Sequence, residues 1–422
     1  MTGSRIRLGA AGLGRAFSLM LPTLALDPRI QLVAGADPRP EGRSQFERDT
    51  GGRTYATVEE LCADPQIDAI YISTPHQFHA ANAKAAARNG KHILCEKPMA
   101  LSIEECLDTI EAARQAGVHL LVGHSHSFDG PIQQARALIE SGAFGEVRML
   151  HALDYTDFLY RPRRPEELET SRGGGILFNQ TPHQVDNIRF IAGGLATSVR
   201  ALTGSWDSER RTEGAYSALL TFANGAFANM TYSGYAHFDS AEFVDGIGES
   251  GMPVSPNAYG GARRKLAGKS IDAEMQIKSE QNYGGPGYVG FDPGKADAGV
   301  DPRTGQASER FHQNFGVLIA SCDRADLRPT SKGVAIYGDF EKRFEELAVR
   351  PVPRMEVIDE LWAAVMHDIA PIHDGRWGLA TMEVCFAILQ SAREGLEIAL
   401  HHQIATPDVT AYRARCLAAG AS

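Results

Sequence analysis

Two glycines near the N-terminus have the spacing that lets the backbone approach a phosphate group. Gly12-Leu13-Gly14 follows an apolar stretch and precedes a helical pattern, where a sharp turn can hold a pyrophosphate at the helix N-terminus. The third glycine of the usual fingerprint is absent, so the two glycines alone also fit a plain strand-to-helix turn. Asp37 lies about 20 residues further on, where a carboxylate that binds a ribose diol is expected. Together with Arg15, these residues predict a dinucleotide-binding site.

The residues around Asp37 bear on the choice of dinucleotide. A carboxylate there hydrogen-bonds a free 2′-hydroxyl and repels a 2′-phosphate, which favours NAD. Arg39 and Arg43 follow closely and could instead hold the phosphate of NADP. We therefore expect NAD as the cofactor, with Arg39 in its site and NADP as the alternative.

Two short polar segments follow later apolar stretches. Thr74-Pro75-His76 comes after AIYIS, and Glu96-Lys97-Pro98 comes after HILC. Ligands bind at the carboxyl ends of the strands in open α/β sheets. A lysine placed there beside a nicotinamide can orient a substrate hydroxyl and, with its pKa lowered, exchange its proton. The alternative is that the lysine lies in an ordinary surface turn.

A parallel sheet would bring these segments together, and the first third of the chain has the pattern of one. Short apolar stretches alternate there with helical patterns, as in an α/β domain. Two capping boxes, Thr57 with Glu60 and Ser102 with Glu105, mark helix starts. The expected strands lie at residues 6–11, 31–36, 69–73, 92–95 and 120–123.

The pattern changes after about residue 125. Residues 216–232 form two alternating runs around Asn224-Gly225, which predicts a hairpin in a largely antiparallel sheet. Residues 246–310 are rich in Gly, Pro, Asn, Asp and Ser and predict a loop-rich insertion. Within it, only residues 262–280 have a helical pattern.

These patterns predict the α/β class with two domains. We expect a dinucleotide-binding domain at residues 1–125 and a substrate-binding and oligomerisation domain at 126–422, with a C-terminal helix at about 380–401.

Composition narrows the classes of partner. The 42 Lys and Arg against 52 Asp and Glu give a net charge of -10, the wrong sign for non-specific binding to nucleic acid or an anionic membrane. Six cysteines without a CxxC pair favour a reducing compartment. No segment approaches 18 consecutive apolar residues, so we expect no membrane span. We expect a cytoplasmic protein without nucleic-acid or membrane partners.

The motifs GLG, ADP, STPHQFH, CEKP and GGGILFNQTPHQVDNIRFIAG follow one another along the chain. In this order they resemble the glucose-fructose oxidoreductase, inositol dehydrogenase and rhizopine-catabolism (Gfo/Idh/MocA) family. The CEKP element is specific, whereas GLG alone is not. The resemblance runs from residue 6 to about 235 and resumes around HDGRWGLATMEVCFAILQSAREG.

The resemblance implies a Rossmann domain followed by an α/β domain whose open sheet often forms an oligomer interface. It therefore implies a homo-oligomer, a dimer or a tetramer, with the nicotinamide between the domains. The cofactor site it implies also includes Ser73, Thr74, Pro75, His76, His79, Glu96 and Lys97.

By the same resemblance, Lys97 and His183 are catalytic, but Asn179 replaces the family's aspartate four residues before the histidine. An aspartate can support a protonated histidine, whereas asparagine can only donate and accept hydrogen bonds. Either His183 and Lys97 share the proton transfer, or Asp186, one helical turn past His183, supplies the missing charge. The alternative for His183 is a core histidine with satisfied hydrogen bonds.

His124 and His126 occupy the start of the second domain, where family members present polar residues to the substrate. Two histidines at this spacing also suggest a metal site, but no further Cys or His spacing completes one, and the family is not metal-dependent. We expect both histidines, and Gln180, to contact the substrate, with no metal.

Four arginines precede the glycine turn that leads to His183. Guanidinium groups grip carboxylates with paired hydrogen bonds, so a cluster near the site suggests an anionic substrate; the alternative is a solvated loop. The four are Arg161, Arg163, Arg164 and Arg172.

Three features together most resemble one branch of the family: the segment GHSHSFDGPI, the Asn179-Gln180 pair, and the long glycine-rich segment before the last strands. That branch oxidises the cis-4,5-dihydrodiol of phthalate to 4,5-dihydroxyphthalate in aromatic degradation. The arginines agree with that substrate, a carboxylated cyclic diol. We therefore expect an NAD(P)-dependent dehydrogenase of a ring carbinol. The alternatives are a sugar or inositol dehydrogenase, an NAD-dependent glycosidase, and a cofactor-binding regulator without catalysis.

Overall fold

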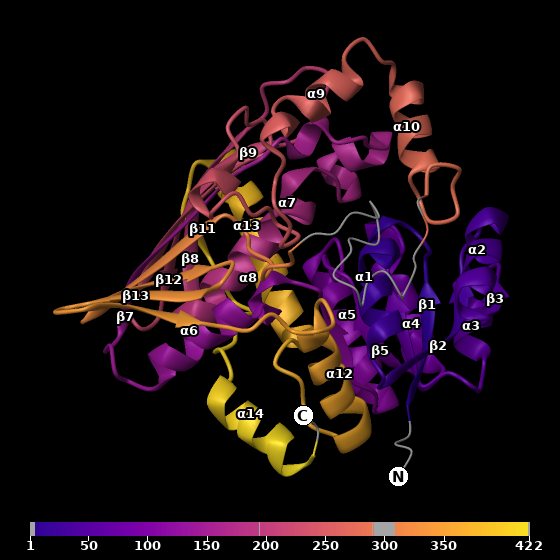
Figure 1. The fold of residues 1–422 in the computed structure, drawn as a ribbon, viewed down its shortest axis with the longest axis horizontal. Helices are drawn as coiled ribbons and strands as arrows, with labels where there is room; N and C mark the ends of the chain where they lie inside the picture. The colour runs from indigo at the N-terminus through magenta and orange to yellow at the C-terminus, as the bar shows by residue number, and fades with distance from the viewer. Residues whose placement is uncertain (1–4, 194, 289, 291–308, 421–422) are drawn as a thin grey trace.

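The apolar stretches expected near the N-terminus all form strands of one parallel sheet. The computed structural model describes residues 5–193, 195–288, 290 and 309–420 (Figure 1). Among them, the first sheet has the strand order β3-β2-β1-β4-β5-β6, the arrangement of a Rossmann domain. Its strands are β1 (Ile6–Ala11), β2 (Ile30–Ala36), β3 (Arg53–Tyr55), β4 (Ala69–Ile72), β5 (His92–Cys95) and β6 (Leu120–Val122).

Helices connect these strands, and their ends follow local sequence signals. Thr57 and Glu60 form the expected reciprocal capping box, and the Ser102 side chain accepts from the Glu105 amide. Gly117 ends a helix with φ of 65°. The helices are α1 (Arg15–Leu26), α2 (Pro40–Thr50), α3 (Val58–Ala63), α4 (His79–Arg88) and α5 (Ile103–Ala116).

The second sheet is mostly antiparallel, as expected, with the order β14-β13-β12-β11-β7-β10-β9-β8-β15; only β7 and β10 pair in parallel. The hairpin around Asn224-Gly225 is confirmed, since β9 and β10 pair antiparallel and Gly225 has a φ of 83°. The strands are β7 (Val147–Tyr155), β8 (Ala196–Gly204), β9 (Ala215–Phe222), β10 (Phe227–Ser233), β11 (Val317–Cys322), β12 (Ala325–Thr330), β13 (Gly333–Gly338), β14 (Lys342–Glu346) and β15 (Ile398–Ala399).

Helices cover the face of this sheet that is turned toward the Rossmann domain (Figure 1). Helices α6 and α8 follow the Rossmann domain in the chain, and α13 packs along β8. The helices of this part are α6 (Gly130–Glu140), α7 (Gly175–Asn179), α8 (Thr181–Ala192), α9 (Gly261–Leu266), α10 (Ile271–Glu280), α12 (Met355–His367), α13 (Gly375–Glu394) and α14 (Val409–Ala418).

The C-terminal helix α13 lies at Gly375–Glu394, so it begins and ends earlier than the expected helix at 380–401. Asp374 caps α13 by accepting from the Trp377 amide at 2.8 Å, so the helix starts at Gly375. Gly395 ends it with φ of 71°, a left-handed conformation that favours glycine, and β15 follows. The predicted helix was too long because the apolar pattern continues past Gly395, and periodicity alone does not locate a C-cap.

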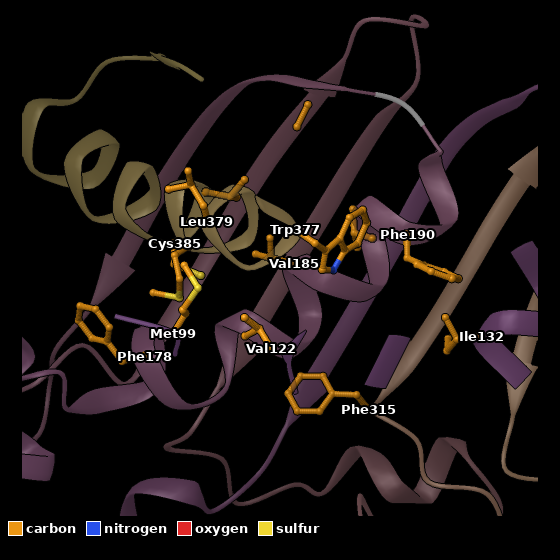
Figure 2. Close-up of a cluster of buried hydrophobic side chains, with 14 of the residues drawn as sticks. Met99, Val122, Ile132, Phe178, Val185, Phe190, Phe315, Trp377, Leu379 and Cys385 are labelled. Carbon is orange, nitrogen blue, oxygen red and sulfur yellow. The ribbon is translucent and has the colours of Figure 1, made fainter. Parts of the chain in front are cut away.

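Helix α13 carries much of the core between the two sheets. Figure 2 shows Trp377 and Leu379 of this helix among buried side chains from both parts of the chain. Val122 comes from β6, and Val185 and Phe190 come from α8. The Phe190 and Trp377 rings meet edge to face with centroids 6.0 Å apart. The two parts therefore share a continuous apolar contact.

The insertion at 246–310 contains more helix than loop composition alone suggests. Helices α9 and α10 occupy most of the expected helical stretch at 262–280, separated by a turn at Gly268 with φ of 70°. Residues 291–308 of the insertion lie outside the described residues. No described helix is long and apolar enough to cross a membrane.

Candidate active site

The glycine turn after β1 has the geometry that a pyrophosphate needs. Gly12 has φ of 87°, and a Cβ there would lie 2.7 Å from the Thr74 amide nitrogen, so only glycine fits. A Cβ at Gly14 would meet nothing within 4 Å, which leaves that backbone open to approach. Helix α1 starts at Arg15, and no side chain caps its N-terminus. An uncapped helix end behind an open backbone fits a bound phosphate.

Asp37 ends β2 beside this turn. Its carboxylate accepts from the Leu13 amide at 2.8 Å and from the Arg39 Nε at 3.0 Å. Arg39 also reaches the Tyr283 carbonyl oxygen at 3.3 Å, so the insertion meets the cofactor domain here. Arg43 donates to the Asp37 carbonyl oxygen at 2.7 Å. Both arginines therefore lie next to the carboxylate that would hold the ribose diol.

The loops after β4 and β5 are tied together by His79. Its Nδ1 lies 2.8 Å from the Pro98 carbonyl oxygen and its Nε2 lies 2.7 Å from the Thr74 carbonyl oxygen. Because both ring nitrogens face backbone, His79 positions the loops around the cofactor rather than offering an atom to it. Ser73 similarly donates to the Gly12 carbonyl oxygen at 2.8 Å.

His76 and Glu96, the other polar side chains expected at the cofactor, have different surroundings. The Nδ1 of His76 lies 2.9 Å from the Gly173 carbonyl oxygen, a contact between the Rossmann domain and the glycine turn before α7. Glu96 is buried and accepts from the Tyr71 hydroxyl at 2.7 Å. Its carboxylate is therefore engaged with the core of the sheet.

Lys97 lies between the two domains. Its ammonium donates a hydrogen bond to the carbonyl oxygen of Asn179 at the end of α7. Burial lowers the pKa of Lys97, although the charges of Glu96 and Glu249 oppose this. The lysine can thus release and accept a proton closer to neutral pH than a lysine in water.

His183 lies in the first turn of α8 and is buried. Burial and the charge of Lys97 hold its pKa well below the usual value, so the imidazole is neutral. Its Nδ1 lies 3.4 Å from the Ser125 hydroxyl. The Asn179 side chain donates to the Gly175 carbonyl oxygen at 2.8 Å, within its own helix. No hydrogen bond joins Asn179 to His183 among the described residues.

Asp186 does not take the place of the missing aspartate at His183. Its two oxygens accept from the Ser127 hydroxyl and the Trp377 indole nitrogen. Ser127 also lies 2.7 Å from the Nε2 of His373. The Asp186 carboxylate lines a small cavity with Lys97, but it is directed into this buried network.

His124 and His126 both contact a carboxylate that the sequence did not single out, Asp129. The distances are 2.7 Å to the Nδ1 of His126 and 3.4 Å to the Nε2 of His124. The Nε2 of His126 lies 4.0 Å from Glu249. Burial by itself lowers the pKa of the His126 imidazole. The negative charges of Asp129 and Glu249 have the larger combined effect and raise this pKa to about 9. The His126 ring also packs against His183, with centroids 4.8 Å apart.

The four arginines divide into two pairs. Arg161 lies 3.8 Å from Glu249, whose carboxylate approaches His126, and the charge of Arg163 contributes to the lowered pKa of Lys97. Arg164 pairs with Glu167 and Glu166 on its own turn. Arg172 is 54% exposed and lies 3.8 Å from Glu169. Arg164 and Arg172, expected at the substrate, therefore face outward into ion pairs of the surface loop.

Arg163 has features of an anion-binding group. Its guanidinium lies over the Phe158 ring, 3.7 Å from the centroid, and burial lowers its pKa to about 10. Its Nε is buried with no hydrogen-bond partner among the described residues. The charge of Arg15, at the start of α1, also acts on it. Gln180 is also buried, at the junction of α7 and α8. Its Oε1 has no hydrogen-bond partner among the described residues.

Sequence reasoning missed two carboxylates at this site. Asp129 follows His126 by three residues, a spacing that a search for paired histidines and carboxylates could have found. Glu249 comes from the insertion, and nothing in its local sequence indicates that it reaches His126. Phe315, which precedes β11, packs against both His126 and His183 at 5.2 Å and also had no sequence signal.

The fold and site define an oxidoreductase that binds NAD in a Rossmann domain. The NAD-binding Rossmann-fold model of the oxidoreductase family matches residues 6–124, and the model of the GFO/IDH/MocA C-terminal domain matches residues 132–252. The chain belongs to the Gfo/Idh/MocA family.

Two relatives are similar over nearly the whole chain. A 1-carboxy-3-chloro-3,4-dihydroxycyclohexa-1,5-diene dehydrogenase of Comamonas testosteroni is 43% identical over 393 residues, which are 93% of this chain and 96% of that protein. The crystal structure of a putative dehydrogenase from Bordetella bronchiseptica RB50 is 41% identical, has a TM-score of 0.85, and covers 94% of this chain and 100% of its own.

More distant structures share the fold. The WlbA dehydrogenase from Bordetella pertussis, in complex with NADH and UDP-GlcNAcA, has a TM-score of 0.64 at 23% identity, with coverage of 94% of this chain and 99% of its own. NAD is the cofactor that the family model indicates for this chain.

Proposed function

We propose that the protein oxidises a carboxylated cyclohexadiene cis-diol to the corresponding catechol, with the cis-4,5-dihydrodiol of phthalate as the specific substrate. The observation that carries this proposal is that Arg161 lies 3.8 Å from Glu249, the carboxylate that approaches His126, while the buried Nε of Arg163 has no hydrogen-bond partner among the described residues. Two guanidinium groups in this part of the chain suit a ring that bears carboxylates. The Comamonas relative, whose name describes a carboxylated dihydroxycyclohexadiene, supports the same substrate class.

In this reaction the carbinol C–H bond breaks, its electron pair moves as hydride, and the hydroxyl proton leaves to a base. Bound NAD⁺ supplies the hydride acceptor at C4 of its nicotinamide. Lys97, with its lowered pKa, takes the hydroxyl proton, and its hydrogen bond to the Asn179 carbonyl oxygen holds the amine in place. The ketone tautomerises to the aromatic catechol, which drives the oxidation.

A panel of substrates tests the proposal. NADH absorbance is followed with NAD or NADP and with dihydrodiol dicarboxylates, dihydrodiol monocarboxylates, inositols and aldoses. Reduction of NAD by the phthalate dihydrodiol supports the specific substrate, whereas preference for a monocarboxylate would retain the class alone. Equal efficiency with inositols would refute the proposal, and release of sugar from a glycoside without net NADH would indicate an NAD-dependent glycosidase. Cofactor binding without any turnover would indicate a regulator.

The same proposal includes a homo-oligomer in the cytoplasm. The homo-oligomer is supported by the outer face of the second sheet, which exposes apolar side chains on adjacent strands. Phe227 pairs directly with Met149, and Leu219 pairs with Asn229 on the next strand. The side chains of Met149, Leu219 and Phe227 are each more than 40% exposed. A large apolar face on a sheet suits an interface between copies of the chain.

A further inference from the structure

The insertion reaches the Rossmann domain through the segment that follows α10, residues 281–288 (Figure 1). Within this segment, Tyr283 is fully buried in the apolar cluster of the Rossmann domain. Its ring meets Phe17 of α1 edge to face, with centroids 5.0 Å apart, and its hydroxyl donates to Asp49 of α2 at 2.7 Å. A side chain of the insertion is therefore part of the core of the domain that binds the cofactor.

Gly284 brings the backbone of the same segment against the start of α2. It has φ of 76°, and a Cβ there would lie 2.5 Å from the Glu41 carbonyl oxygen, so any larger residue would displace the segment. Glu41 lies in the first turn of α2, and Arg39 is the N-cap residue of this helix. The segment therefore contacts the turn that follows Asp37.

This contact helps to hold the side chain of Arg39. Its Nη1 donates to the Tyr283 carbonyl oxygen at 3.3 Å, its Nη2 to the Leu13 carbonyl oxygen at 2.6 Å, and its Nε to Asp37 at 3.0 Å. Every nitrogen of the guanidinium thus has an acceptor. Because the guanidinium is planar and its N–H directions are fixed, the three bonds together set its position.

The position of Arg39 bears on the choice of dinucleotide. In Rossmann domains that bind NADP, an arginine in this region accommodates the 2′-phosphate. Here Arg39 would have to turn away from Asp37, Leu13 and Tyr283 to grip a phosphate with paired hydrogen bonds. Arg43 is engaged as well, since its Nη1 donates to the carbonyl oxygens of Asp37 and Pro38 at 2.7 Å and 3.0 Å. A ribose with a free 2′-hydroxyl makes no such demand on either arginine.

We propose that segment 281–288 of the insertion determines the selectivity for NAD over NADP, by holding Arg39 on Asp37 through the Tyr283 carbonyl oxygen. The Asp37 carboxylate by itself repels a 2′-phosphate. The segment adds the cost of freeing the arginine that would otherwise offset this repulsion. Selectivity for the adenosine ribose therefore depends on a part of the chain far from the dinucleotide-binding motif.

The proposal is tested by cofactor binding, so the result does not depend on the substrate. NADH and NADPH are titrated separately into the protein and followed by their fluorescence. We expect NADPH to bind roughly 100-fold more weakly than NADH, as the loss of two hydrogen bonds to charged groups would give. Equal dissociation constants for the two cofactors would overturn the proposal.

Tyr283→Ala removes the anchor of the segment. It should lower the ratio of the NADPH to the NADH dissociation constant roughly 10-fold, the effect of one hydrogen bond to a charged group. Adding Arg39→Ala to this variant should abolish the gain in NADPH affinity, because the freed arginine binds the phosphate. Tyr259→Ala is the matched control, since Tyr259 of the same insertion is 70% exposed. It should leave both dissociation constants unchanged.

Two outcomes with these variants would contradict the proposal. If Tyr283→Ala weakened NADH and NADPH binding by the same factor, the segment would only stabilise the Rossmann domain. If the gain in NADPH affinity persisted without Arg39, this arginine would not be the group that the segment restrains.

Gly284→Ala displaces the segment without opening a cavity in the core, so it decides the question if Tyr283→Ala does not fold. It should also lower the ratio of the two dissociation constants. Gly268→Ala is its matched control, because Gly268 has φ of 70° but a Cβ there would meet nothing within 4 Å. Thermal unfolding without cofactor shows that each variant is folded. The same ratio in Gly284→Ala and Gly268→Ala would overturn the proposal.

Discussion

Lys97 is half-buried and held by one backbone oxygen, a position that suits the proton transfer that we propose for it. Its ammonium contacts the Asn179 carbonyl oxygen, while Glu96, its neighbour in the chain, is turned to Tyr71. The lysine therefore has no direct carboxylate partner among its described hydrogen bonds. A buried amine without a bonded counter-charge has a lowered pKa, as proton transfer requires.

Lys97→Ala should lower kcat by roughly 10²- to 10⁴-fold, the usual contribution of a general base. The affinity for NADH should change little, because the glycine turn and Asp37 form the cofactor site separately. Stopped-flow turnover and fluorescence titration with NADH check the two effects. Unchanged turnover would remove Lys97 from the mechanism.

Arg163 and Arg172 offer a matched test of the anion pocket. Arg163→Ala should raise KM for a dicarboxylate roughly 10- to 100-fold, since a hydrogen bond to a charged group contributes about 1.5–3 kcal/mol. Arg172→Ala should have little effect, because its side chain is exposed and pairs with Glu169. Steady-state kinetics give the KM of each variant for the dicarboxylate. Equal effects of the two substitutions would contradict the assignment.

Asp154 should make stability depend on pH. Burial raises the pKa of this carboxyl from 3.8 to about 7, and Glu249 and Asp239 add repulsion. The folded state therefore binds the proton more tightly than the unfolded chain, so stability is greatest below about pH 4 for this group and falls as pH rises toward 7. Each pKa unit corresponds to about 1.4 kcal/mol.

Asp154→Asn should remove this contribution. Urea unfolding at pH 5 and pH 8 should show that the variant loses less stability between the two values than the wild type. Asp326→Asn, on an exposed position of β12, should keep the wild-type difference. The same pH response in wild type and Asp154→Asn would show that the carboxyl is not protonated in the fold.

At the scale of elements, local signals predicted most of the Rossmann domain and only part of the site. Strand β3 was missed, because Arg53–Tyr55 is short, polar and partly exposed at the sheet edge. Lys97 and His183, for which we propose roles in the reaction, were singled out because each follows or belongs to a recognisable element. Glu249 could not be found, because its approach to His126 depends on the path of the insertion rather than on any local pattern.

Helix α12 shows how tertiary contacts cross the expected domain boundary. Val357, Ile358 and Leu361 are fully buried in the same apolar cluster as Ile6 and Leu8 of β1. A helix far along the chain thus completes the core of the Rossmann domain. This helix was not predicted from the sequence, and no local pattern indicates the sheet against which it packs.

Leu361→Ala should therefore destabilise the protein by about 2–5 kcal/mol, the usual cost of truncating a fully buried leucine. It should also weaken NADH binding if the Rossmann domain loosens. Leu417→Ala is the matched control, because Leu417 of α14 is 65% exposed. Urea unfolding measures both variants, and a similar small effect of each would contradict the role of α12 in this core.

Among the described residues, helices cover one face of the second sheet and leave its other face uncovered. The covered face meets α8 and α13, which join it to the Rossmann domain and the active site. On the other face, strand register places the exposed Met149, Phe227 and Leu219 on three adjacent strands. Solvent-exposed apolar side chains so arranged are unfavourable for a monomer and favourable for a second sheet.

We therefore expect the protein to be a dimer or a tetramer in solution, assembled through this face. Light scattering after size exclusion should give two or four times the chain mass of 45.7 kDa. Leu219→Glu combined with Phe227→Glu should yield monomers, because charged groups directly across the interface would be buried without partners. Leu417→Glu, an equal change on α14 away from this face, should leave the assembly intact. A wild-type protein that is monomeric at micromolar concentration, or a double variant that keeps the full assembly, would show that the face does not join subunits.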